Sequence, residues 1–421
     1  MVSEPRITAL VGGLLIDGTG RGPIEDSIVL IRDKEIVAVG KEGEVHVPTE
    51  AKVIDVSGMT VMPGLIDAHM HFMGAKTDRF VEEWLLRPWP LGLIKSVFDA
   101  KALLEAGFTT VKDCGSRAGI YLREAIKEGL IKGPRIVTAG PALSQTFGHG
   151  DAHYLPIEWV KDRRKHYGFI CDGVDECIRA ARLALREGAD FIKVCASGGV
   201  LSQKDRPEHV QFTLEELKAI VQVARNAGTF VTAHCQCAEG MKNCILAGVK
   251  TIDHAIFPDE EVIEMARGKE VIFVSTLSIA KRIVEKGEKV GMPPWGVQKA
   301  KEVYAAMVKN IRWLYESGMT MAAGTDFCGT PTLPHGDNSL ELELLVKESG
   351  YKPMDAIIAV TKNAAKACGL EDQIGTIEKG KLADIIVVSG NPLKDITVLR
   401  DKENIKLVMK EGEIEVQRSP L

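Results

Sequence analysis

The stretch VMPGLIDAHMHF, residues 61–72, reads as a buried β-strand that ends in two histidines. It is the first of eight short apolar runs that alternate with helix-like segments between about residues 61 and 370. Such alternation predicts an α/β protein with βα units around a parallel sheet, and eight strands are the number that closes a (β/α)8 TIM barrel. The other seven runs are FTTVKDC (108–114), PRIVTAG (134–140), DFIKVCAS (190–197), TFVTAHC (229–235), KTIDHA (250–255), VIFVSTL (271–277) and MTMAAGTD (319–326).

The segments between these runs carry helix signals. Residues 213–228, TLEELKAIVQVARNAG, begin with the capping-box pair Thr213 and Glu216 and end at Gly228, where a left-handed residue fits after a helix. A second helix is predicted over about residues 297–317, before Gly318. The loop after the third strand, about residues 141–172, is unusually long, and long loops in compact domains are often functional.

The two ends of the chain differ from the middle. Residues 1–61 and 372–421 contain short alternating segments with Gly and Asp turns, such as SIVLIRDKEIVAVG and IKLVMKEGEIEV. Alternation of this kind is typical of antiparallel strands. We therefore expect a small β-sandwich domain built from both termini, and a (β/α)8 barrel over residues 62–371.

Composition limits the classes of partner. The chain has 421 residues, 45% hydrophobic and 26% charged, and a net charge of −5, which offers no basic tract for nucleic acid. No apolar run approaches the roughly 20 residues that span a bilayer, and the N-terminus lacks a basic leader before an apolar segment. The nine cysteines show no CxxC pair. They predict reduced core thiols in a cytoplasmic protein.

Histidines stand at the strand ends, where a barrel of this kind places its chemistry. His69 and His71 are two residues apart, so both side chains point to the same side of a strand. His234, His254 and Asp326 end the fifth, sixth and eighth runs. A single one of these histidines could be an interior residue, and Asp326 could be a helix N-cap. Together they predict a site for zinc or a similar divalent ion.

Lys193 lies in the fourth run, inside an otherwise apolar strand. Period-two alternation turns it into the barrel, and burial is expected to depress its pKa toward the neutral amine. A neutral amine reacts with carbon dioxide to form a carbamate, whose two oxygens could bridge two metal ions. The alternative is a lysine that is ion-paired with Asp326 or another carboxylate in a metal-free mouth.

This ensemble resembles the amidohydrolase superfamily over nearly the whole chain. The matching residues are PGLIDAHMH, Lys193, His234, His254 and GTDF, together with GTIEKGKLADIIVV near the C-terminus. Within the superfamily it looks most like the binuclear branch related to imidazolonepropionase, which includes metal-dependent prolidases, Xaa-Arg carboxypeptidases and ochratoxin-type amidases. The segments SQTFGHGDAHYLP and KVCASGGVLSQKDRPEHVQFTLEELKAIV carry this closer resemblance.

The resemblance implies two divalent ions, zinc by expectation, with a hydroxide between them. One ion would be held by His69, His71, Lys193 and Asp326, and the other by Lys193, His234 and His254. The implied reaction is amide hydrolysis, in which Asp326 accepts a proton from the nucleophile and passes it to the leaving amine.

Further residues are candidates for contact with substrate. His149, in FGHGD on the long loop, is expected to donate to the carbonyl oxygen as it becomes an oxyanion, unless it is a solvated loop histidine. Tyr154, Arg206 and His209 are expected to bind a substrate carboxylate, with Arg206 favoured by its fork geometry, although it could be a surface charge. Thiolate catalysis by Cys195, Cys235 or Cys328 is the less favoured alternative to packing.

Three functions are compatible with this site. The first is a dipeptidase, carboxypeptidase or N-acyl amino acid amidase, for which the substrate is a small molecule. The second is hydrolysis of a xenobiotic amide, phenylurea or carbamate. The third is an inactive scaffold of the same fold. We also expect a homo-oligomer.

Overall fold

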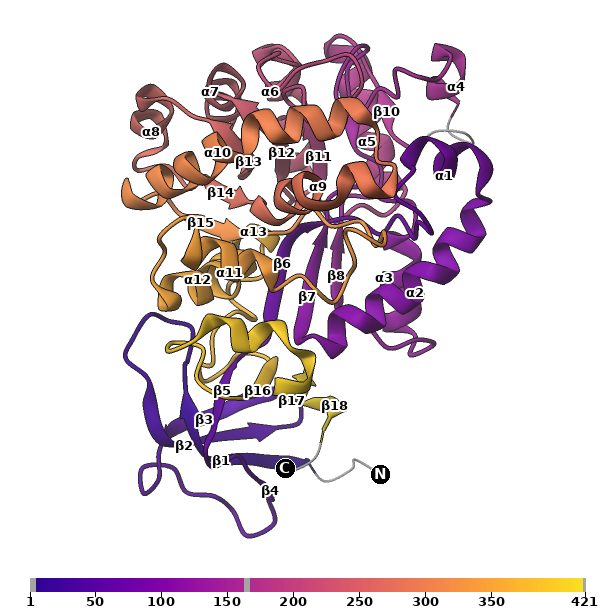
Figure 1. Ribbon diagram of the computed structural model, residues 1–421. Helices are drawn as coiled ribbons and strands as arrows, with labels where there is room; N and C mark the ends of the chain where they lie inside the picture. Colours follow the sequence, from indigo (N-terminus) through magenta and orange to yellow (C-terminus); the bar gives the residue numbers. More distant parts are fainter. Residues whose placement is uncertain (1–4, 163–166, 419–421) are drawn as a thin grey trace.

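All eight predicted runs form parallel strands in the computed structural model, which describes residues 5–162 and 167–418 (Figure 1). The strands are β6 (Leu65–Met70), β7 (Phe108–Asp113), β8 (Arg135–Thr138), β11 (Ile192–Cys195), β12 (Val231–Cys237), β13 (Thr251–Phe257), β14 (Ile272–Ser275) and β15 (Met321–Ala323). They pair in the orders β6-β7-β8 and β11-β12-β13-β14-β15, and β15 packs beside β6. The short strands β9 (Leu143–Ser144) and β10 (Phe169–Ile170) extend the second sheet beyond β11. The protein is thus an α/β fold with parallel sheets.

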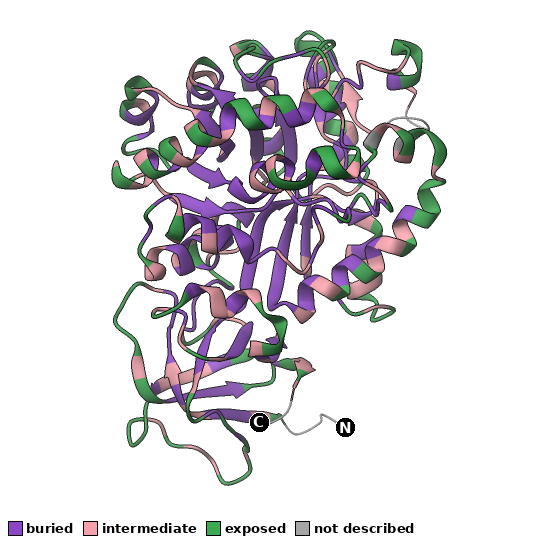
Figure 2. Ribbon diagram, viewed as in Figure 1, coloured by how far each residue is buried: buried purple, intermediate pink, exposed green. Residues whose placement is uncertain are grey.

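The helices lie outside these strands, with their exposed residues turned outward (Figure 2). The capping box of Thr213 and Glu216 is formed at the start of α6, and Gly228 has φ +71°. The second predicted helix is α10, which begins at Pro294 and ends at Glu316. The helices are α1 (Phe80–Leu86), α2 (Trp89–Glu105), α3 (Gly119–Lys127), α4 (Ile157–Lys161), α5 (Val174–Arg186), α6 (Leu214–Asn226), α7 (Ala238–Ala247), α8 (Glu260–Ala266), α9 (Leu277–Val290), α10 (Pro294–Glu316), α11 (Leu340–Lys347), α12 (Pro353–Ala359) and α13 (Lys362–Cys368), with 3-10 turns η1 (Ile396–Arg400) and η2 (Lys402–Asn404).

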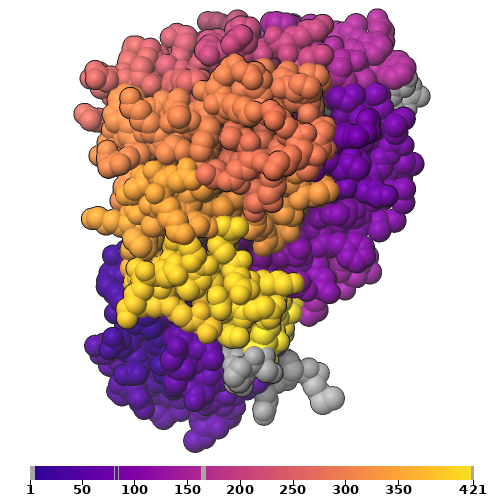
Figure 3. Space-filling view, in the orientation of Figure 1, coloured from indigo at the N-terminus to yellow at the C-terminus, as the bar shows by residue number. Residues whose placement is uncertain are grey.

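Strands from both ends of the chain share one further sheet, in the order β18-β17-β16-β5-β1-β2-β3, with β4 paired to β1. Figure 3 shows the two terminal segments side by side. This sheet has its own apolar core, which includes Leu10, Val29, Ile385 and Leu407. Its strands are β1 (Ile7–Leu15), β2 (Ile24–Arg32), β3 (Glu35–Lys41), β4 (Lys52–Asp55), β5 (Met59–Pro63), β16 (Ile385–Ser389), β17 (Ile405–Lys410) and β18 (Glu413–Gln417).

The long loop after β8 is only partly irregular. It contains β9, α4 and β10, and its residues 163–166 lie outside the described residues. All nine cysteines are buried free thiols, as the sequence predicts. Every helix in the described part of the chain is too short or too polar to cross a lipid bilayer.

Candidate metal centre

Four histidines meet at the carboxyl ends of the parallel strands. The ring centroid of His69, on β6, lies 5.2 Å from that of His71 and 4.8 Å from that of His254 on β13. His234, on β12, lies 4.6 Å from His254 between ring centroids. The strand ends therefore bring the four predicted imidazoles into one cluster.

Asp326 reaches this cluster from the segment after β15. Its Oδ1 lies 3.1 Å from Nε2 of His71 and 3.5 Å from Nε2 of His69. Side-chain atoms of these three residues approach within 4.8 Å of one another, close enough to share a metal ion. They are three of the four ligands predicted for the first ion, the fourth being Lys193.

A buried network fixes the backbone on either side of Asp326. The Asp67 carboxylate on β6 accepts bonds from the Thr325 hydroxyl at 2.7 Å and the Asn338 amide at 2.6 Å. It also accepts the backbone N–H of His69 at 3.0 Å. One carboxylate thus connects the segment that carries His69 with the segment that carries Asp326.

Each of the four histidines has one ring nitrogen turned to a protein partner. The contacts are His71 Nδ1 to Gly115 O at 2.8 Å, His234 Nε2 to Gly198 O at 3.1 Å, His254 Nδ1 to Thr276 Oγ1 at 2.8 Å, and His69 Nδ1 to Asp253 Oδ2 at 2.9 Å. The last contact is close but poorly aligned for a hydrogen bond. A hydrogen bond at one ring nitrogen fixes the orientation of the imidazole and keeps the proton on that nitrogen. The other nitrogen therefore keeps its lone pair for a metal ion.

The charges of His234, His254 and Asp326 suit a cation, whereas His69 differs: burial acts to lower its pKa, but Cys114 and Asp253 raise it well above the ordinary value. Burial lowers the pKa of His254 to about 3, and burial together with neighbouring His149 holds the pKa of His234 well below its ordinary value. Although burial acts to raise the pKa of Asp326, its bonds with His69 and His71 hold it well below the usual range. Neutral imidazoles and a carboxylate are the ligand forms that bind divalent zinc. The residues present therefore fit a metal centre.

Lys193 lies on β11 with 3% of its surface exposed, and its Nζ forms an ion pair with Asp253 Oδ2. The expectation of a depressed pKa is wrong. Burial does act to lower the pKa of Lys193, but the adjacent Asp253 carboxylate raises it above the ordinary value. The carboxylate that pairs with the lysine is thus Asp253, rather than Asp326.

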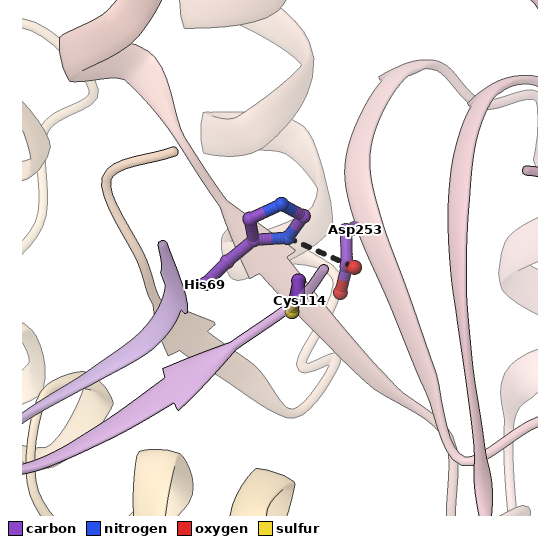
Figure 4. A group of neighbouring side chains, drawn as sticks. All are labelled: His69, Cys114 and Asp253. Atoms are coloured by element: carbon purple, nitrogen blue, oxygen red, sulfur yellow. Dashed lines mark ion pairs between the residues drawn. The ribbon is translucent and has the colours of Figure 1, made fainter. Parts of the chain in front are cut away.

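Asp253 is the main residue that sequence reasoning missed. Figure 4 shows its carboxylate facing His69, with Cys114 from the end of β7 beside them. In a regular strand, Asp253 and His254 would point to opposite sides. His254 has φ +73°, which breaks the alternation and lets both side chains reach the cluster. The sequence carries no signal for this irregularity.

His149 stacks on His234, with ring centroids 4.0 Å apart and an interplanar angle of 13°. The long loop therefore brings this residue to the histidine cluster. Gly199 permits the close packing, since a Cβ there would lie 2.3 Å from the His149 ring.

The proposed carboxylate-binding residues lie farther out on the loops. Arg206 is exposed, with Glu208 and Glu302 each 3.9 Å from its guanidinium. His209 is exposed, and its Nδ1 accepts the backbone N–H of Arg206 at 3.3 Å. Tyr154 is partly buried, which raises the pKa of its phenol.

The cysteines beside the ligands are buried. Burial raises the pKa of Cys195 to about 11 and that of Cys328 well above its ordinary value. Both are therefore thiols near neutral pH, which favours packing over nucleophilic catalysis.

Comparison with known proteins places the chain among hydrolases. The sequence model of the Amidohydrolase family matches residues 60–414. Ochratoxinase from Aspergillus niger is 35% identical over 431 aligned residues, which cover 98% of this chain and 87% of the relative. A solved prolidase complexed with N-methylphosphonate-L-proline matches with a TM-score of 0.90 and 32% identity, covering 98% of this chain and 100% of the other. A Xaa-Pro dipeptidase with bound methionine matches with a TM-score of 0.87 and 34% identity, covering 97% and 99%.

Proposed function

The chain belongs to the amidohydrolase family and is a hydrolase acting on C–N bonds, and we propose that it cleaves the amide bond of a dipeptide or an N-acyl amino acid. The observation that carries this proposal is the cluster of buried His69 with half-buried His71 and Asp326, to which His234 and His254 are joined. We also infer that the eight parallel strands close into a (β/α)8 barrel and that the terminal sheet forms a small β-sandwich domain.

We assign two metal ions, both zinc, to this cluster. His69, His71, Lys193 and Asp326 would hold one, and Lys193, His234 and His254 the other. When bound, such ions would acidify a water molecule and polarise the scissile carbonyl group.

A carbamate on Lys193 is part of this proposal. It requires the amine to lose its proton although Asp253 holds the pKa of Lys193 above the ordinary value, and it requires Asp253 to tolerate the loss of the lysine charge. A second cation lies within reach of that carboxylate. Lys112, fully buried on β7, has its Nζ 3.1 Å from Thr251 Oγ1, which in turn lies 3.3 Å from Asp253 Oδ1. Asp253 would thus keep Lys112 as a counter-charge, and it could accept the N–H that remains on a carbamylated Lys193.

Asp326 is the proposed proton carrier. Its carboxylate contacts the cluster from one side, and its low pKa leaves it ionised and able to accept the proton of the attacking water. The same group then returns the proton to the leaving amine. His149 is the second protein group proposed to contact the substrate.

Peptide substrates are favoured because the chain matches both a prolidase and a Xaa-Pro dipeptidase at 32–34% identity over nearly their whole lengths. Tyr154, Arg206 and His209 are the proposed contacts for a substrate carboxylate. The similarity to ochratoxinase supports a second candidate, hydrolysis of a xenobiotic amide on the same site. A homo-oligomer and a cytoplasmic location stay predictions.

An assay of the zinc-loaded enzyme against matched panels tests the proposal. One panel holds Xaa-Pro dipeptides, other dipeptides and N-acyl amino acids, and the other holds aryl amides, phenylureas and carbamates. We expect turnover in the first panel, lost on chelation, restored by zinc and absent from Asp326→Ala. Turnover confined to the second panel would refute the peptidase assignment, and a folded, zinc-binding protein inactive on both would favour the scaffold.

A further inference from the structure

A chain of three buried or partly buried side chains begins at His149 and leads away from the metal centre. His149 Nδ1 lies 2.9 Å from the Ser202 hydroxyl oxygen. Ser202 Oγ in turn donates to Asp205 Oδ1, and Asp205 is only 1% exposed. The order is imidazole, hydroxyl, carboxylate, and it joins the loop after β8 to the loop after β11.

The geometry assigns the direction of each hydrogen bond in this chain. A serine hydroxyl has one hydrogen, and the carboxylate is the strongest acceptor within its reach. Because that hydrogen points to Asp205, the Ser202 oxygen accepts from His149. The neutral His149 ring therefore carries its hydrogen on Nδ1 and leaves Nε2 for the substrate.

A second residue fixes the orientation of the carboxylate. Gln211 Nε2 donates to Asp205 Oδ2 at 2.9 Å, and Gln211 Oε1 accepts the backbone N–H of His149 at 2.8 Å. The Gln211 amide thus contacts both ends of the chain. Since its oxygen is used by His149, its nitrogen must face Asp205.

Lys299, on α10, holds the loop that supplies Ser202 and Asp205. Its Nζ donates to the backbone oxygens of Gly199 at 2.8 Å, Ser202 at 2.7 Å and Asp205 at 2.7 Å. The ammonium also lies 3.8 Å from Asp205 Oδ1. A single helix residue thus fixes three carbonyl groups of a segment without regular structure.

We propose that Ser202 and Asp205 are positioning residues, which hold His149 as the Nδ1–H tautomer with Nε2 presented to the substrate. This inference rests on the proposed function, in which His149 contacts the substrate. It also revises the role expected from the sequence. The neutral ring presents a hydrogen-bond acceptor at Nε2, so His149 would accept a hydrogen bond from the substrate, whereas donation to a carbonyl oxygen would require the doubly protonated ring.

The proposal makes an unusual prediction for Asp205→Asn. Gln211 still requires an oxygen at this position, so the amide nitrogen of the substituted side chain would have to face Ser202. Ser202 Oγ would then accept from that amide and donate its own hydrogen to His149 Nδ1 at 2.9 Å, which is nearer than its other acceptor, Gly199 O at 3.2 Å, an oxygen that already accepts from Lys299. An almost isosteric change should therefore switch His149 to the Nε2–H tautomer without removing a hydrogen bond.

Nitrogen-15 NMR of histidine-labelled, zinc-loaded protein at pH 8 reads this tautomer directly, with His149→Gln to assign the signals. We expect Nδ1–H in the wild type, Nε2–H in Asp205→Asn, and loss of the Nδ1 hydrogen bond in Ser202→Ala. An Nε2–H wild-type ring, or an Asp205→Asn variant with an unchanged tautomer, overturns the proposal. This arm needs no turnover, so it remains decisive if the proposed amide hydrolysis fails.

Kinetics supply the second arm on any substrate that the enzyme turns over. Ser202→Ala and Asp205→Asn should lower kcat on the order of 100-fold, with KM and zinc content little changed, while Ser202→Thr restores most of kcat. Ser349→Ala, at a buried serine between α11 and α12 that donates to Val308 O of α10, is the matched control and should retain wild-type kcat. Wild-type kcat in both Ser202→Ala and Asp205→Asn would overturn the positioning role. Thermal unfolding of each variant detects any folding defect. If Ser202→Ala shows such a defect, Ser202→Thr provides a folded variant for comparison.

Discussion

Replacement of Asp253 by Asn should destabilise the metal-free protein more than a typical substitution. The carboxylate is fully buried, pairs with Lys193 Nζ and lies 2.9 Å from His69 Nδ1. Because Asn has nearly the same shape, no cavity forms, and the change leaves the Lys193 ammonium buried without its anion. Breaking a buried pair in this way costs about 3–5 kcal/mol of unfolding free energy.

The expected shift in melting temperature follows from the length of the chain. At roughly 2.1 cal/mol/K per residue, the 421 residues give an unfolding entropy of about 0.9 kcal/mol/K. The loss then corresponds to a fall in Tm of about 3–6 °C. Asp372→Asn, at an exposed aspartate, is the matched control, and its Tm should stay within about 1 °C of wild type.

The assay is thermal unfolding of chelator-treated protein at pH 7, followed by circular dichroism. Although burial acts to raise the pKa of Asp253, Lys193 and His69 hold it below its ordinary value. The stabilising effect is therefore complete above the unfolded pKa of about 3.9 and fades as the pH falls below it.

A double-mutant cycle separates the ion pair from other effects of the substitution. Lys193→Met alone leaves Asp253 without its ammonium partner, whereas the double variant removes both charges. We expect the double variant to be more stable than the sum of the single losses by on the order of 2 kcal/mol. An unchanged Tm in Asp253→Asn, or strictly additive losses, would show that this pair does not hold the strands together.

Three further results are expected. Lys193→Ala should bind fewer than two zinc ions per chain by elemental analysis, and a variant that keeps two ions and full activity contradicts the bridge. Asp326→Asn should lower kcat by about 10²- to 10⁴-fold in steady-state assays, and retention of more than a tenth of wild-type kcat would remove Asp326 as the proton carrier. Burial lowers the pKa of His335 to about 3, whereas the pKa in the unfolded chain is about 6.5. Below pH 6.5 the unfolded chain therefore binds one proton more than the folded protein. The free energy of unfolding falls by about 1.4 kcal/mol per pH unit on acidification as a result. His335→Gln keeps a donor for His71 O. Urea unfolding between pH 6 and 5 should show that the unfolding free energy of this variant depends less steeply on pH than that of the wild type. Equal slopes for the two proteins would contradict the prediction.

The sequence predicts the strands and most of the candidate ligands because both follow from local patterns. Apolar runs mark the eight strands, and the period of two between His69 and His71 places both on one side. The capping box of α6 is likewise a local signal, formed by Thr213 and Glu216 three residues apart.

The remaining features depend on contacts between distant segments. The partner of Lys193 stands 60 positions away, at Asp253, and this contact reverses the pKa shift that burial alone implies. Ser202 and Asp205 lie in a segment without periodicity, so only the folded loop shows that they connect to His149. Such pairings follow from the tertiary structure rather than from the spacing of residues.

Backbone strain at the centre gives a physical reason for the buried network around it. Two proposed ligands have positive φ, +73° at His254 and +58° at Asp326, and this region is uncommon for residues other than glycine. Strained residues persist only where the surrounding contacts over-determine them. The Asp67 carboxylate supplies such contacts on one side of the cluster, through Thr325 and Asn338. The fixed backbone then aims Asp326 at the histidines before any ion binds, which lowers the cost of assembling the metal site.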